Sequence, residues 1–217
     1  MKERPILFTG AMVRALLDGS KTQTRRIMKP QPEVRPGSEG KHWWPATSFQ
    51  SMLTIQDCAL PGYEGIAGEA CPHGGRGDRL WVREATEIDE QTSDKVILSR
   101  YSADRAPVLL AGCADVEFNG TVAHWDYSRR TRPSIHMPRW ACRIELEITD
   151  VCVERLQDIS QADCIAEGAP GGHGSIPGYN YSATPYEHYK HIWESINGAG
   201  SWDTNPWVWV IGFRRIN

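Results

Sequence analysis

The sequence predicts an α+β fold: a small, mostly antiparallel β-barrel decorated by about three short helices and interrupted by two long loop insertions. Short segments alternate apolar and polar residues as half-buried strands do, most clearly Trp140 to Val153. Other segments carry the cap residues and apolar spacing of short helices. Because closure removes exposed strand edges, a closed or half-closed barrel is the arrangement that these elements favour.

The N-terminal region predicts one strand and one helix. Pro5 to Phe8 has the composition of a short strand, and Thr9 or Gly10 then caps a helix. Gly19 ends this helix in the C′ position, where a left-handed backbone is usual. The apolar stripe of the helix consists of Met12, Val13, Leu16 and Leu17.

Three further strands are expected in the middle and at the end of the chain. Gly77-Asp78 forms a turn before Arg79 to Arg83, which alternates. In the segment from Trp140 to Val153, apolar side chains alternate with charged ones, giving one buried and one wet face. Trp207 to Phe213 is apolar on both sides and therefore predicts a central strand.

Two capping boxes predict the remaining helices. Ser160-Gln161-Ala162-Asp163 opens a short helix that ends at Glu167-Gly168. Thr184-Pro185-Tyr186-Glu187 opens a longer helix, which combines a cap, a proline at N1 and an acid at N3. Asn197-Gly198 closes it.

The rest of the chain lacks sustained periodicity and is assigned to insertions in one domain that covers residues 1–217. The insertions span about 36–76 and 87–135; Trp43-Trp44 is expected to pin the first, and a small hairpin is expected in the second. A chain of 217 residues with nine Trp and seven Tyr has enough apolar material for one core.

Composition limits the partners and the compartment. A net charge of −3 argues against coating a long polyanion, although arginines gather near the N-terminus and at 129–143. No apolar run approaches the roughly 18 residues of a membrane span, and the N-terminus lacks a signal-peptide core, so we expect no membrane association and a cytoplasmic location. Six widely spaced cysteines without a Cys-x-x-Cys pair predict reduced, mostly buried thiols.

The run from Lys21 to Arg26 is the strongest chemical signal. A lysine whose pKa is lowered by burial or a nearby cation can take the proton of a threonine hydroxyl, which makes Thr24 a candidate nucleophile and Lys21 its base. Arg25, Arg26 and Thr22 are candidates for binding a polar substrate. The alternative is a solvated strand, and on a regular strand residues 21 and 24 point to opposite faces unless the backbone turns between them.

Glu167 is the candidate acid. It ends a short helix, where the macrodipole disfavours an ionised carboxylate and so favours a proton-exchanging role. The glycine-rich loop that follows is either a mobile lid or a plain loop. An exposed glutamate without function is the alternative for Glu167 itself.

Several blocks together resemble one family. The chain is similar to the ASCH family, a branch of the PUA-like β-barrels, and most similar to its long phage- and prophage-encoded members. The insertions at 36–76 and 87–135 are not covered by the resemblance. The matching blocks are Gly19-x-Lys21-Thr22-x-Thr24-x-Arg26, residues 77–84, the helix ending in Glu167, and residues 193–198, 201–203 and 205–210.

The resemblance implies an activity. Small bacterial ASCH proteins hydrolyse N4-acetylcytidine with a lysine, a threonine and a glutamate at the positions of Lys21, Thr24 and Glu167, and with a basic residue at the position of Arg26. We therefore expect a cofactor-independent and metal-independent amidohydrolase that acts on N4-acylated cytidine. This chain is much longer than those enzymes, and its insertions are free to reshape the pocket.

Other functions stay open at this point. The resemblance also implies non-catalytic binding of RNA or a modified base, with Arg25, Arg26 and the arginines at 129–143 on phosphate, or a ribonuclease in the same cleft. The partner is thus a small nucleoside or RNA, and the sequence leaves the oligomeric state undetermined. Two weak metal patterns (Glu187, His188, His191, Glu194; Cys58, Cys71, His73) lack the required ligand spacing, and stacking by Trp43, Trp44 and Trp202 is less expected than packing.

Overall fold

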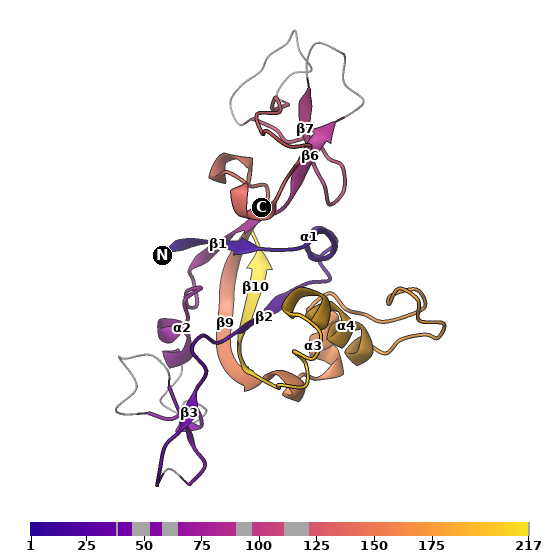
Figure 1. Cartoon of the computed structure of the whole chain (residues 1–217). Coiled ribbons are helices and arrows are strands. Elements are labelled where there is room, and N and C mark those ends of the chain that lie inside the picture. The colour runs from indigo at the N-terminus through magenta and orange to yellow at the C-terminus, as the bar shows by residue number, and fades with distance from the viewer. Residues whose placement is uncertain (38, 45–52, 58–64, 90–96, 111–121, 217) are drawn as a thin grey trace. The chain divides into compact units, whose positions relative to one another are not determined.

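The structure is a computed structural model that describes residues 1–37, 39–44, 53–57, 65–89, 97–110 and 122–216 (Figure 1). It divides into two compact units, each assembled from separate stretches of the chain. The first unit comprises Met1–Lys2, Ser20–Asp78 and Glu147–Arg214, and the second comprises Glu3–Gly19, Arg79–Leu146 and Arg215–Asn217. No helix in these described ranges has the length and apolar character that a membrane crossing requires.

The expected α+β class is confirmed, but the main sheet is mixed and is not closed into a barrel within the described residues. Its five strands have the order β1-β5-β9-β10-β2. The parallel pairing of β1 with β5 makes the sheet mixed, while β10 and β2 pair antiparallel. The strands are β1 (Glu3–Leu7), β2 (Gln23–Ile27), β5 (Arg79–Arg83), β9 (Glu145–Arg155) and β10 (Trp207–Arg215).

The strand alternation that predicted β9 is present, with one shift of its start. Ile144, Leu146 and Ile148 are fully buried, as the pattern predicts. The stretch that contains Trp140, however, forms a short 3-10 helix, Arg139–Ala141, and the strand itself begins at Glu145. Pro138 is the N-cap of that turn, and its nitrogen has no hydrogen to donate to a neighbouring strand.

Capping residues set the helix boundaries where the sequence predicts them. α1 (Gly10–Leu17) begins at the N-cap Thr9, and Gly19 follows its end at a φ of +81°. Both capping boxes are formed, by Ser160 with Asp163 in α3 (Gln161–Ala166) and by Thr184 with Glu187 in α4 (Pro185–Asn197). Because α3 ends at Ala166, the backbone places Glu167 at the C-cap of this helix.

The first insertion and the residues just before it contain regular structure that the sequence pattern does not reveal. β3 (Glu33–Val34) pairs antiparallel with β4 (His42–Trp43), and α2 (Ile66–Ala70) adds a fourth α-helix within the described residues. Trp44 is 1% exposed, and its ring lies 5.6 Å from that of Trp209, so of the expected tryptophan pair it is Trp44 that packs this segment against the sheet.

The second insertion carries its own small sheet. β6 (Thr86–Asp89) lies between β7 (Leu98–Tyr101) and β8 (Thr131–Arg132), antiparallel to both. The antiparallel pair β6–β7 is the hairpin expected in this region. A satellite core of the second unit supports the sheet and contains Tyr101, Val108, Ala123, Met137 and Ala141.

In the first unit, α3 and α4 contribute side chains to a common apolar core. The two helices lie side by side next to β2 (Figure 1). Large aromatic side chains make up much of this core, and their burial contributes roughly 1.5–3 kcal/mol or more each. Its buried members are Leu156, Ile159, Cys164, Ala169, Tyr189, Trp193, Trp202, Val208 and Val210.

Candidate functional site

Backbone hydrogen bonds of Thr22 connect α3 to the edge of the sheet. Its N–H donates to the carbonyl of Ala166, the last residue of α3, over 2.8 Å. Its own carbonyl accepts from the N–H of Phe213 in β10, over 2.9 Å. The Thr22 side chain is exposed, so its contribution is made by the main chain, which holds Lys21 beside the end of the helix.

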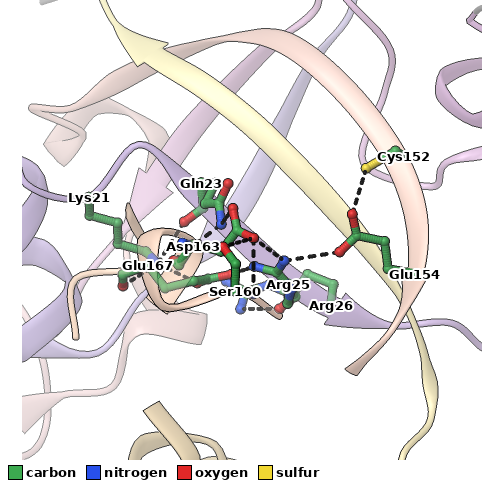
Figure 2. Close-up of polar contacts among 9 residues, drawn as sticks. All are labelled: Lys21, Gln23, Arg25, Arg26, Cys152, Glu154, Ser160, Asp163 and Glu167. Carbon is green, nitrogen blue, oxygen red and sulfur yellow. Dashed lines mark hydrogen bonds and ion pairs between the residues drawn. The ribbon is translucent and has the colours of Figure 1, made fainter. Parts of the chain in front are cut away.

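Lys21 and Glu167 form a buried ion pair (Figure 2). Lys21 Nζ lies 2.8 Å from Glu167 Oε2 and also donates to the main-chain carbonyls of Glu167 and Gln23, each over 2.8 Å. The two side chains are 0% and 1% exposed. The acid predicted by the sequence thus lies against the predicted base and away from bulk water.

Arg25 is the second cation of the cluster. Its Nη1 lies 3.4 Å from Glu167 Oε1, and its Nη2 lies 3.0 Å from Glu154 Oε2 and 3.5 Å from Asp163 Oδ2. Burial by itself lowers the pKa of Arg25, but the negative charge of Glu167, with Glu154, outweighs it and raises the pKa above the usual value. Arg25 therefore stays charged and connects the carboxylates of Glu154 in β9 and Asp163 in α3 to the Lys21–Glu167 ion pair.

Gln23 completes the contact between β2 and α3. Its Nε2 donates to the carbonyl oxygen of Asp163 over 3.2 Å and to Oδ1 of the same residue over 3.1 Å. The other carboxylate oxygen of Asp163 accepts from the N–H and hydroxyl of Ser160, the N-cap of α3. One residue thus caps the helix and connects it to the strand (Figure 2).

Thr24 lies apart from this network. Its side chain is fully buried, and its Oγ1 has no hydrogen-bond partner among the described residues. β2 begins at Gln23, so Lys21 lies before the strand. The side chains of Lys21, Gln23 and Arg25 all form polar contacts with residues of α3 or its C-cap. Thr24 lies between them in sequence and makes no such contact. The structure therefore brings Lys21 and Glu167 together and does not join Thr24 to them by a hydrogen bond.

Arg26 lies next to the cluster, half-buried, and its Nη1 donates to the carbonyl of Arg25 over 3.4 Å. Burial lowers the pKa of Arg26, against the opposing effects of Glu167 and Tyr189. Tyr189 of α4 is buried, which raises its pKa well above 10, and the charge of Glu167 raises it further. The phenol is therefore neutral.

Burial also lowers the pKa of Lys21 below its ordinary 10.5, although the charge of Glu167 and its hydrogen bond act in the opposite direction. Arg26 and Arg25 lower the pKa further by charge repulsion. A lysine with a lowered pKa exists as the neutral amine in a larger fraction of molecules, and only the neutral amine can accept a proton. The electrostatics at Lys21 thus act in the direction that a base requires.

Sequence reasoning missed four residues of the cluster: Gln23, Glu154, Asp163 and Tyr189. Gln23 follows Lys21 by two positions and precedes Arg25 by two, so strand alternation alone could have placed it on their side. Asp163 was recognised only as a capping residue. Glu154 and Tyr189 carry no local signal, because their proximity depends on how β9 and α4 pack.

A cavity of about 310 Å³ lies in the first unit, and none of its lining residues is a candidate catalytic or substrate-binding residue. Within the described part of the chain, no group of three His, Cys, Asp or Glu side chains is arranged to hold a metal ion. Cys71, Cys142, Cys152 and Cys164 carry reduced thiols, while Cys58 and Cys113 lie outside the described residues. The cavity is lined by Arg76, Gly77, Glu147, Ile148, Thr149 and Arg214.

Comparison with known proteins places the chain in no group. No protein-family model, curated protein or solved structure matches it.

Proposed function

We propose that the protein is an amidohydrolase of the ASCH branch of the PUA-like proteins, which removes the acyl group from N4-acylated cytidine. One observation carries the proposal: Lys21 and Glu167, from distant parts of the chain, form a buried ion pair. Thr24, which is close to Lys21 in sequence, is also buried, and its hydroxyl has no hydrogen-bond partner in the described fold. A buried polar group without a partner needs an explanation, and a nucleophile held for substrate is one.

In the first proposed step, Thr24 is acylated. The step begins when Lys21 passes a proton to Glu167 within the pair, which leaves an amine and a carboxylic acid. Lys21 takes the proton of the Thr24 hydroxyl while the oxygen attacks the acyl carbonyl carbon. The C–N bond breaks, and Glu167 gives its proton to the departing N4 nitrogen.

In the second proposed step, water restores the enzyme. The Glu167 carboxylate takes one proton from water, and the resulting hydroxide attacks the ester carbonyl. The bond to Thr24 breaks, its oxygen recovers a proton from Lys21, and a carboxylic acid leaves. Both groups then return to the state in which they began, so the cycle consumes only water and requires no cofactor.

Substrate binding requires the cluster to open and to realign. Lys21, Thr24 and Glu167 are each no more than 4% exposed, so the acyl group reaches them only after the residues that cover them move. The same movement must bring Thr24 within hydrogen-bonding distance of Lys21. In this proposal, Arg26 and Arg25 stabilise the developing oxyanion, and the exposed Thr22 lies at the entrance.

Hydrolysis of N4-acetylcytidine tests the proposal, with cytidine measured by chromatography. Thr24→Val removes the hydroxyl at nearly constant shape and is expected to lower turnover by at least about a hundredfold, whereas Thr24→Ser retains the hydroxyl and part of the activity. Lys21→Met and Glu167→Gln are expected to lower turnover similarly. Substrate that stays intact at high concentrations of folded wild-type protein refutes the proposal.

Recognition without catalysis is the second candidate. It is favoured by the way Gln23 and Glu167 already accept hydrogen bonds from the Lys21 ammonium, as in a structural ion pair. In this case the protein binds RNA or a modified base, and binding weakens with salt. RNA binding is then expected to persist in Thr24→Ala and to be lost in Arg26→Ala. A Thr24→Ala variant that no longer binds RNA contradicts this candidate function.

A further inference from the structure

Arg132 packs against two aromatic rings near the end of the second insertion. The Arg132 guanidinium carbon lies 5.2 Å from the ring centre of Trp125 and 5.1 Å from that of Tyr127. Arg132 is only 5% exposed and forms an ion pair with Asp126. Because the guanidinium is stacked and paired, it fixes both rings in place rather than serving as a mobile charge.

The two rings continue into an exposed aromatic surface. The Tyr127 ring lies 6.0 Å from the ring of His136 at an interplanar angle of 30°, so the two are tilted only moderately from parallel. His136 is exposed, and Trp125 and Tyr127 are half-exposed. Their fixed orientation lowers the entropic cost of binding a flat partner. We call Trp125, Tyr127, Arg129, Arg132 and His136 the Arg132 surface.

Arginines are concentrated in the sequence around this surface. Between residues 122 and 143 the chain contains five arginines and a single acid, Asp126. Arg132, Arg139 and Arg143 form ion pairs with carboxylates, and Arg129 and Arg130 have exposed side chains. The Arg129 carbonyl accepts a hydrogen bond from Trp125 Nε1 over 3.0 Å, so this arginine is anchored by its main chain beside the aromatic rings.

We propose that the Arg132 surface binds single-stranded RNA. Exposed flat rings stack on unpaired bases, and arginines beside them contact the phosphates that connect those bases. A base in a duplex has its faces covered, whereas a single strand offers both free base faces for the rings and phosphates for the arginines, so it fits both features. RNA is assigned rather than DNA because the substrate proposed above is a ribonucleoside, and that choice alone rests on the proposed function.

Fluorescence anisotropy with a labelled single-stranded RNA of 12 nucleotides tests the proposal. Tyr127→Leu is expected to weaken binding about tenfold, while Tyr127→Phe keeps the ring and the affinity. Arg129→Gln is expected to lower the dependence of log K on log salt by about 0.7. Arg76→Gln, an equal charge change at an exposed arginine of the first unit, is the control and leaves that slope unchanged.

The outcomes separate this proposal from the amidohydrolase. If Tyr127→Leu and Arg129→Gln bind RNA as the wild type does, the surface has no such role, whatever the enzymatic result. Equal affinity for duplex RNA also overturns it, because stacking requires unpaired bases, and preference for single-stranded DNA overturns the assignment to RNA. Free N4-acetylcytidine does not need this surface, so Arg129→Gln is expected to hydrolyse it at the wild-type rate.

Discussion

The Nζ of Lys21 lies 2.8 Å from Oε2 of Glu167, although 146 positions of the chain separate the two residues. Both side chains are almost completely removed from solvent. A pair of this kind is costly to desolvate and strongly destabilising to break, because the remaining charge is then buried without its partner. The stability of the fold and the chemistry proposed for it therefore depend on the same two atoms.

Removing either partner is expected to destabilise the protein by about 3 kcal/mol, at the lower end of the range for buried pairs. Arg25 still faces Glu167 when Lys21 is replaced, which limits the loss. The double variant Lys21→Met/Glu167→Gln is expected to have a loss in free energy of unfolding that is smaller than the sum of the two single losses by at least about 1 kcal/mol. Urea unfolding of the four proteins measures this coupling, and strictly additive losses would contradict a direct interaction.

Thr24→Val is expected to raise the free energy of unfolding by about 1 kcal/mol. The hydroxyl is buried and has no partner among the described residues, so its removal relieves an uncompensated desolvation cost. Thr24→Ser keeps that cost and loses a methyl group, so it is expected to be destabilising by about 1 kcal/mol. Thermal unfolding of both variants checks the order, and a destabilised valine variant would show that the hydroxyl has a structural partner.

Alkaline pH is expected to stabilise the wild-type protein relative to Lys21→Met. Burial lowers the pKa of Lys21 in the folded state below 10.5, so the folded protein releases this proton at a lower pH than the unfolded chain. Between the two pKa values the unfolded state binds more protons, and stability rises with pH. Urea unfolding of both proteins from pH 7 to 10 tests this. If the free energy of unfolding of the wild type relative to Lys21→Met falls with rising pH, the pKa of Lys21 is raised in the folded state.

Replacing Arg25 is expected to affect stability more than its position in an edge strand suggests. Its guanidinium interacts with three carboxylates, those of Glu154, Asp163 and Glu167, and Arg25→Met leaves all of them without it. We expect a loss of about 3 kcal/mol for methionine. Arg25→Lys retains the charge but not the planar fork, and should recover only part of this loss in the same measurement.

Gln23→Leu provides a comparison on the same strand. Among the described residues, its side-chain amide donates to Asp163, and the amide carries no charge. The expected loss in free energy of unfolding is therefore about 1 kcal/mol. Urea unfolding ranks Gln23→Leu against Arg25→Met. A larger effect at Gln23 than at Arg25 would indicate that the hydrogen bond to α3, rather than the charges, holds this helix on the sheet.

Local signals in the sequence were sufficient for most elements. Thr9, Ser160 and Thr184 cap helices that begin at the next residue, because a cap acts through atoms within three positions of itself. The strands β5 and β10 also lie where alternation and apolar character predict them. α2 was missed because it has five residues, too few for a helical period, and its N-cap Gly65 provides no side chain.

Sheet closure and the arrangement of the site were not contained in such signals. The expectation of a barrel rested on the general cost of exposed edges. In the described residues, β1 and β2 instead end the sheet without pairing with each other, and the parallel pairing of β1 with β5 makes the sheet mixed. Lys21, Thr24 and Glu167 were chosen for their residue types and for a family resemblance. Whether they meet depends on the hydrogen bond from Thr22 to Ala166, which no local pattern encodes.

The amino-acid sequence alone determined the limits of α1, α3 and α4 and the buried faces of the strands, since each of these depends on neighbours a few residues away. It also supplied the amine of Lys21 and the acid of Glu167. Only the tertiary structure decided that this amine and acid meet in a dry environment, that Arg25 joins them, and that the hydroxyl of Thr24 stays outside their hydrogen bonds. The physical reason is that desolvation and charge pairing depend on distances in space, and packing of β2 against α3 sets those distances.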